Sequence, residues 1–190
     1  MCARDGWNDR RCHNGVVVAD SVARARDVIA SASRVTVLTG AGISTDAGIP
    51  DFRGPHGVWT KNPKAEKMST LSAYIGDREV RELAWQSRLH SPVWEASPTR
   101  GHLALVELER AGQLHAIITQ NIDRLHHKAG NDPSRIYEVH GNALQTLCWS
   151  CGDVREMTEA IERVRAGETD RSEEHTSELQ SHHDLVCRLL

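Results

Sequence analysis

The chain has 190 residues, of which 39% are hydrophobic and 26% are charged, a balance typical of a globular protein rather than a disordered one. Its net charge of -3 gives no electrostatic reason to expect direct binding to nucleic acid or to an anionic membrane. No apolar run approaches a membrane span, and the charged N-terminus lacks the apolar centre of a signal peptide, so we expect a cytoplasmic protein.

The first third of the chain predicts one helix and one strand. Residues 1–19 carry no strong periodicity, and we expect a loose leader. Residues 20–33 predict a helix that Asp20 or Ser21 caps, with one apolar stripe. The stripe consists of Val22, Ala25, Val28 and Ile29. The short branched run at 34–39 predicts a buried strand.

The middle of the chain predicts a second helical region at 69–91, in which Trp85 and Leu89 are spaced by four. Pro92 and Pro98 bound a short connector. A clear helix follows at 101–114. Its inward residues are expected to be Leu103, Val106 and Leu108, and Gly112 lies near its C-terminus.

Two further strands are predicted at 115–121 and 135–141. Strands that alternate with helices predict an α/β fold, with a parallel sheet and helices packed on both faces. The chain changes character at its end, where residues 171–181, "RSEEHTSELQS", match the translation of a common sequencing-adapter DNA. We therefore treat 171–190 as an artefactual tail on which no functional argument rests.

A glycine-rich turn follows the first predicted strand. Gly40 and Gly42 end that strand, where a backbone without side chains can approach a pyrophosphate. The usual dinucleotide fingerprint requires a third glycine at position 45, which is Thr45 here. Taken alone, the turn is weak evidence, and a simple tight turn is the more common explanation.

Five motifs in order give the chain its resemblance to sirtuins, the NAD-dependent protein deacylases. They are "GAGISTDAGIPDFRG", "GPHGVWT", "TQNIDRLHHKAG", "VHGN" and "CWSC". The resemblance covers roughly residues 20–165, and the GVWT wording is most similar to bacterial members. It implies a Rossmann-like fold with a small zinc-binding module, and NAD and zinc as cofactors. The implied reaction transfers an acyl group from lysine to ADP-ribose and releases nicotinamide.

The resemblance assigns the first group of NAD contacts to the glycine-rich turn and the loop after it. These contacts are Gly40, Ala41, Gly42, Thr45, Asp51, Phe52, Arg53 and Trp59. Arg53 can neutralise phosphate or steer a carboxylate, and Phe52 can shield the reactive ribose carbon from water. Without the motif, core packing for Phe52 and a surface ion pair for Arg53 are the more common roles.

The second group lies in "TQNID", directly after a predicted strand, where ligands bind in such sheets. By resemblance, Gln120 and Asn121 face the ribose, while Asp123 and the Ile122 backbone hold the nicotinamide carboxamide. An ordinary turn is the alternative for this polar run. Arg124 stands where many relatives have glycine, and we expect its side chain to point outward.

His140 in "VHGN" matches the catalytic base of the family and also contacts NAD, and Asn121 completes the implied catalytic pair. In the implied reaction the acyl-lysine oxygen attacks the ribose carbon as nicotinamide leaves. His140 then deprotonates a ribose hydroxyl, which takes over the acyl group, and imidazole can accept a proton near neutral pH. The remaining histidines are expected to be structural. They are His56, His90, His102, His115, His126 and His127.

Cys148 and Cys151 are the only closely spaced pair among five cysteines, which favours a metal or redox use over disulfides. Two thiolates at this spacing can hold a tetrahedral zinc, although a structural site needs four ligands. The family places its second pair roughly twenty residues further on, inside the adapter-like tail here, so we predict half a zinc site. A thioredoxin-like redox pair is the alternative, but such a pair opens a helix near the start of its domain.

These patterns divide the chain into a leader at 1–19, the first part of an NAD-binding domain at 20–147, the start of a zinc module at 148–170, and the tail at 171–190. We expect an NAD-dependent lysine deacetylase acting on an acyl-lysine protein or peptide, with the chain as written inactive because its sheet is incomplete. A protein ADP-ribosyltransferase and a non-catalytic NAD or ADP-ribose binding module are the alternatives. The presence of His140 and Asn121 argues against the second of these.

Overall fold

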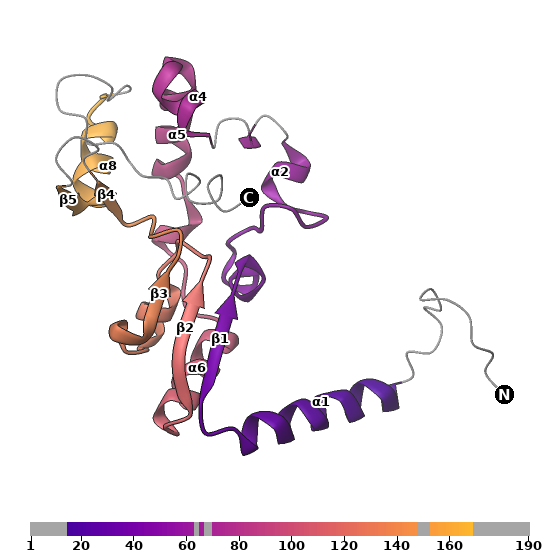
Figure 1. Cartoon of the computed structure of the whole chain (residues 1–190). Coiled ribbons are helices and arrows are strands. Elements are labelled where there is room, and N and C mark those ends of the chain that lie inside the picture. The colour runs from indigo at the N-terminus through magenta and orange to yellow at the C-terminus, as the bar shows by residue number, and fades with distance from the viewer. Residues whose placement is uncertain (1–14, 63–64, 67–69, 148–152, 169–190) are drawn as a thin grey trace.

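The computed structural model describes residues 15–62, 65–66, 70–147 and 153–168 of the chain (Figure 1). The helices are α1 (Gly15–Ser31), α2 (Val58–Lys61), α4 (Leu71–Gly76), α5 (Arg78–Leu89), α6 (Arg100–Arg110), α7 (Leu125–Ala129) and α8 (Met157–Arg165). Short 3-10 turns are η1 (Ala41–Ile43), η2 (Thr45–Ala47), η3 (Pro92–Trp94) and η4 (Pro133–Arg135). The strands are β1 (Val35–Thr39), β2 (Leu114–Thr119), β3 (Ile136–Glu138), β4 (Gln145–Leu147) and β5 (Val154–Glu156).

A parallel sheet with the strand order β1-β2-β3 forms the centre of the molecule. Leu38 pairs with Ile118, and Ile117 pairs with Ile136 on the other side of β2. The branched residues of β2 suit a strand covered on both faces, and Ile117 is fully buried. The structure thus confirms the three predicted strands and the parallel α/β architecture. The prediction that the first strand is buried is wrong, because β1 lies at the edge of the described sheet and its Leu38 is 66% exposed. β3 is shorter than predicted chiefly at its C-terminal end, because the chain turns at Val139 and His140, where the backbone N–H of Gly141 donates to the carbonyl of Glu138 at 3.1 Å.

Helix α6 packs against β2 and connects to it by a short turn. Its buried residues are His102 and Val106, one turn apart on the same helix face. Leu103 is 49% exposed, so the prediction that it points inward is wrong. Successive residues of a helix are rotated by about 100° about its axis, so Leu103 lies off the face on which its neighbour His102 is buried. Gly112 adopts a φ of 74°, the left-handed conformation that glycine allows, and confirms the predicted end of the helix.

Helix α1 begins at Gly15, five residues before the predicted start. Asp20 and Ser21 therefore lie inside the helix, and the prediction that one of them caps it is wrong. The apolar stripe is present in the sequence, but it faces solvent: Val28 is 69% exposed and Ile29 is 47% exposed. Figure 1 shows α1 extending away from the sheet.

A second small core forms where α5 meets α8. The predicted helical region at 69–91 is divided into α4 and α5 by Asp77, whose carboxylate caps α5 by accepting hydrogen bonds from the backbone N–H groups of Glu79 and Val80. Trp85 of α5 is 1% exposed, with Leu89 packed at the margin of the same core. The α8 residues of this core are Met157, Ala160, Ile161 and Val164.

Strands β4 and β5 form an antiparallel pair that adjoins α8. The pairing joins Gln145 to Glu156 and Leu147 to Val154, so the domain boundary predicted at 147/148 falls inside this pair. The closely spaced cysteines lie outside the described residues. Among those described, no helix is both long and apolar enough to cross a membrane.

Candidate functional site

The carboxyl ends of β1 and β2 meet at one edge of the sheet, where the two polar predicted motifs begin. The backbone N–H of Gln120 donates to the carbonyl of Thr39 at 3.0 Å, which continues the strand pairing by one residue. After Gly40 the chain forms the short 3-10 turns η1 and η2. The hydroxyl of Thr45 donates to the carbonyl of Gly42 at 3.1 Å and closes this turn.

Asn121 and Asp123 are joined to the glycine-rich turn by a buried network of hydrogen bonds. The Asn121 side-chain amide donates to the carbonyl of Gly40 at 3.0 Å and to the hydroxyl of Ser44 at 3.1 Å. The Ser44 hydroxyl in turn donates to Asp123 Oδ2 at 2.6 Å. Asp123 Oδ1 accepts the backbone N–H of Leu125 at 2.9 Å. Asn121 and Asp123, predicted to face the ribose and the carboxamide, are therefore held together before any ligand is considered. Gln120, also predicted to face the ribose, is exposed.

Ser44 is the central residue of this network, and the sequence reasoning missed it. It is 1% exposed and lies between Asn121 and Asp123, about eighty positions away in the chain. A serine within a glycine-rich turn is ordinarily a turn residue, so its type gives no signal of this role. A buried hydroxyl that both accepts and donates is the kind of group that fixes neighbouring polar side chains.

Two buried histidines lie behind the network, as expected for structural residues. A hydrogen bond of 2.9 Å joins His126 Nε2 to the hydroxyl of Thr39, and the rings of His126 and His102 lie 4.7 Å apart. Burial and, to a lesser degree, the neighbouring His102 lower the pKa of His126 to about 4. Burial also lowers the pKa of His102. Both rings are therefore neutral near pH 7.

The residues predicted on the loop after the turn form a second group. The ring of Phe52 lies 4.9 Å from that of Trp59, and the guanidinium of Arg53 lies over Trp59 at 4.6 Å from the ring centre. Phe52 is 37% exposed, which excludes simple core packing as its role. Asp51 Oδ1 accepts the backbone N–H of Gly54 at 3.1 Å and closes the turn between the aromatic residues.

Gly57 explains why this loop can fold so tightly. A Cβ atom at this position would lie 2.5 Å from the backbone of Phe52 and 2.6 Å from Asp51 Oδ1, which no side chain tolerates. The close approach allows the backbone N–H of Trp59 to donate to the carbonyl of Phe52 at 3.0 Å. The glycine in "GVWT" thus sets the stacking of Trp59 with its two partners.

His140 lies in the loop that follows β3 and is partly buried. Its Nδ1 atom is buried and has no hydrogen-bond partner within the described part of the chain. This loop is hydrogen-bonded to the loop that follows β2: the backbone N–H of Ala143 donates to the carbonyl of Ile122 at 2.7 Å. His140 and Asp123 therefore lie on two loops that are directly bonded to each other.

Arg124 does not point outward, so that prediction is wrong. Its side chain is 30% exposed, and its Nε atom lies 3.5 Å from Glu138 Oε1. Its backbone adopts a φ of 57°, which is the left-handed region that glycine favours. An arginine at a glycine position is thus accommodated at a conformational cost, with its charge directed toward a carboxylate.

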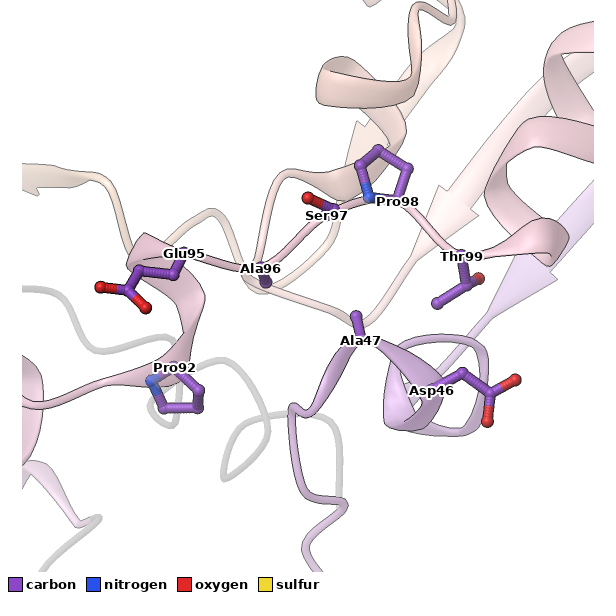
Figure 2. Close-up of a pocket in the computed structure, with 8 residues that line it drawn as sticks. All are labelled: Asp46, Ala47, Pro92, Glu95, Ala96, Ser97, Pro98 and Thr99. Atoms are coloured by element: carbon purple, nitrogen blue, oxygen red, sulfur yellow. The ribbon is translucent and has the colours of Figure 1, made fainter.

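A cleft of about 470 Å³ lies beside the glycine-rich turn, between η2 and the segment that joins η3 to α6 (Figure 2). Its lining residues are Asp46, Ala47, Pro92, Glu95, Ala96, Ser97, Pro98 and Thr99. The carboxylates of Asp46 and Glu95 point away from each other in Figure 2. None of the predicted site residues lines this cleft, so we assign it no ligand.

The predicted metal ligands Cys148 and Cys151 lie outside the described residues. Within the described ranges, no group of three or more histidine, cysteine or acidic side chains is placed to hold a metal ion. The zinc assignment therefore stays a prediction.

Comparison of the sequence with protein families identifies one match, to the Sir2 family, over residues 40–184. The matched range extends into the tail at 171–190. NAD-dependent protein deacetylase 2 of Streptomyces coelicolor is 43% identical over 136 residues, covering 72% of this chain and 56% of the relative. NAD-dependent protein deacetylase 1 of Bradyrhizobium diazoefficiens is 41% identical over 138 residues, covering 72% and 53%. The chain thus spans about half the length of these curated relatives.

Solved structures give the same result for the fold. A Sir2 enzyme from a study of the mechanism and regulation of these enzymes superposes with a TM-score of 0.69 at 33% identity, covering 86% of this chain and 62% of that one. A Sir2 complex with a deacetylated p53 peptide and 3'-O-acetyl ADP-ribose superposes with a TM-score of 0.68 at 31% identity, covering 77% and 58%.

Proposed function

The chain belongs to the Sir2 family, and on that premise we propose that the whole protein is an NAD-dependent protein-lysine deacetylase. Its substrates are NAD and an acyl-lysine protein or peptide, and its products are the free lysine, nicotinamide and acyl-ADP-ribose. The names of the curated relatives and the peptide and acetyl ADP-ribose of the solved Sir2 complex support this proposal. We also propose a cytoplasmic location, supported by cysteine usage.

One observation carries the proposal: Asn121 and Asp123 are bonded through Ser44 to the backbone of the glycine-rich turn at Gly40. The two motifs are about eighty residues apart in the sequence, and they meet at the edge of the sheet where ligands bind in parallel α/β folds. Asp123 supplies an acceptor for an amide N–H, and the side-chain oxygen of Asn121 supplies a further acceptor, because both N–H groups of the Asn121 amide already donate to Gly40 and Ser44. This set suits a carboxamide next to a ribose.

We assign the proton transfer to His140. Its loop is bonded to the loop of Asp123, so a base and a carboxamide acceptor are presented from neighbouring strands. Phe52 lies exposed on the loop after the turn, where it can exclude water from the reacting sugar. NAD itself supplies the electrophilic ribose carbon when it is bound.

The test uses the protein carried to its relatives' length, with NAD and an acetylated peptide, and mass spectrometry of all products. We expect stoichiometric free peptide, nicotinamide and acetyl-ADP-ribose. His140→Ala should retain NAD binding within about threefold and lose at least about a hundredfold in turnover, because a general base contributes 10²–10⁴ to the rate. Turnover at the wild-type rate in this variant would contradict the assigned mechanism.

The same experiment distinguishes the two alternatives. A protein ADP-ribosyltransferase would leave ADP-ribose attached to protein, with the acetyl group still on the peptide. A binding module would take up NAD without releasing nicotinamide. Neither alternative has a specific observation in its favour among the described residues.

We further propose that Cys148 and Cys151 provide two of the four ligands of a structural zinc ion. The support is their spacing and the β4–β5 pair that flanks them, since such sites commonly lie between short antiparallel strands. The experiment that tests this proposal is given in the Discussion.

A further inference from the structure

Glu138, the last residue of β3, lies close to three polar side chains: one from the loop after β2, one from α7 and one from the loop after β3. Its Oε1 atom lies 3.5 Å from Arg124 Nε and 3.5 Å from His127 Nδ1. Its Oε2 atom accepts a hydrogen bond of 3.1 Å from the side-chain amide of Asn142. The carboxylate is only 16% exposed, so these contacts are partly shielded from water.

Arg124 is the permanent cation among these partners. Burial lowers the pKa of His127, while Glu138 opposes that effect, and a guanidinium keeps its charge throughout the working range of pH. Asn142 is neutral and bonds the other carboxylate oxygen. The electrostatic partner of Glu138 at neutral pH is therefore Arg124.

Arg124 is also the only non-glycine residue with a positive φ in the described part of the chain, at φ 57° and ψ 20°. A non-glycine residue is disfavoured in this conformation relative to the right-handed helical region, because its Cβ atom crowds the following carbonyl oxygen. Such strain persists only where surrounding contacts hold it. The contact with Glu138 acts on this residue directly.

The strained turn lies between Asp123 and helix α7, and the backbone N–H of Leu125 just after it donates to Asp123 Oδ1 at 2.9 Å, so the turn holds one oxygen of that carboxylate. Glu138 lies two residues before His140 and pairs across the sheet with Thr119. The backbone bond from Ala143 to Ile122 joins the same two loops further out. A contact between residues 124 and 138 thus links the loop of the carboxamide acceptor to the loop of the base.

We propose that Glu138 is a positioning residue, which holds Arg124 in its left-handed turn and thereby sets Asp123 relative to His140. This role rests on the proposed deacetylase function, and Glu138 itself touches neither substrate nor NAD in it. The contact between Glu138 and Asn142 keeps the base loop in place at the same time.

Glu138→Gln tests the charge alone, because the amide oxygen can still accept from Asn142. In the protein carried to its relatives' length, we expect kcat to fall about tenfold with the KM for peptide unchanged, since a misplaced reacting group costs rate rather than binding. Carbon chemical shifts of residue 124, measured by NMR in the same protein, should lose their left-handed signature. This second readout requires no turnover, so it tests the turn even if the proposed reaction is wrong.

Arg124→Gly is the matched variant, because glycine adopts the left-handed conformation without a partner. In a Glu138→Gln background it should restore kcat to within about threefold of the wild type, and alone it should leave kcat nearly unchanged. Two results would overturn the proposal. One is an unchanged kcat and an unchanged turn in Glu138→Gln. The other is a loss that Arg124→Gly fails to rescue, which would show that Glu138 acts on His140 by another route.

Discussion

Single residues of this site act through partners that are far away in the chain. Thr39 ends β1 and bonds His126, while Ser44 bonds both Asn121 and Asp123. A buried polar group is costly when it is unpaired, so each of these side chains needs the other to be in place. The site and the stability of the sheet edge therefore depend on the same contacts.

The neutral buried histidines predict a dependence of stability on pH. The pKa of His126 is about 4 when folded, against about 6.5 in an unfolded chain. Between these values the unfolded state binds more protons, so the free energy of unfolding decreases as the pH falls from about 6.5 to about 4. We expect a loss on the order of 2 kcal/mol from His126, discounted for solvent screening. Urea unfolding at pH 7.5, 6 and 5 measures it.

His126→Gln is the comparison for this titration, since it keeps a polar group toward Thr39 and removes the ionisable ring. The variant should have a lower free energy of unfolding than the wild type at pH 7.5, but that free energy should decrease less between pH 7.5 and pH 5. The free energy of unfolding of the variant should still depend on pH to some extent, because burial lowers the pKa of His102 as well. A variant with the same slope as the wild type would show that the His126 ring does not titrate in this way.

At the scale of the elements, residue type and periodicity predict the longer strands of the sheet and the helix that packs on it. β1, β2 and α6 were predicted because branched strands and a helical period have few other interpretations. The division of the segment 69–91 at Asp77 was not predicted. An aspartate in a helical pattern can cap a new helix or lie within a continuous one, and the pattern alone does not distinguish the two. Helix α7, only five residues long, has too few turns for a period to be visible.

In the candidate site, the sequence identified the residues that lie in motifs resembling those of sirtuins. Residues in ordered motifs, such as Asn121 and Asp123, could be chosen from the sequence. Ser44 and Glu138 could not, because their roles come from contacts that only the fold creates. The direction of Arg124 was predicted wrongly for the same reason: its partner lies on another strand.

The β4–β5 pair gives the element-scale prediction. It has three residues in each strand, and a pair of this size is marginal in water without a further constraint. A zinc ion bound by Cys148 and Cys151 would cross-link the connection between the strands. In the protein at its relatives' length, Cys148→Ser should reduce the bound zinc to well below one ion per chain and should lower the melting temperature.

Cys12→Ser is the matched control for that measurement, because Cys12 lies far from the pair in the sequence and should leave the zinc content unchanged. The metal is measured by plasma mass spectrometry on folded, chelator-washed protein. Zinc at the wild-type stoichiometry in Cys148→Ser would contradict the ligand assignment.

At the scale of the whole molecule, the chain exposes apolar surface at one side of the sheet. β1 pairs only with β2 in the described structure, and its Leu38 is 66% exposed. On α1, Val22 is 59% exposed and Val28 is 69% exposed, and the helix extends away from the sheet in Figure 1. Surface of this kind favours association and lowers stability in an isolated chain. Assays of activity therefore belong in the protein at its relatives' length, and residues 1–190 alone are expected to be inactive.

The account depends on a single claim, that NAD binds where the carboxyl ends of β1 and β2 meet. Calorimetric titration of NAD against Asp123→Asn tests it most directly, because the substitution keeps the size of the side chain but removes its charge and leaves one acceptor oxygen where Asp123 uses two, for Ser44 and Leu125. Asp132→Asn, on an exposed turn, is the matched control. We predict that Asp123→Asn weakens NAD binding about tenfold, roughly 1.4 kcal/mol, while the control binds as the wild type does. Equal affinity in all three proteins would contradict the claim.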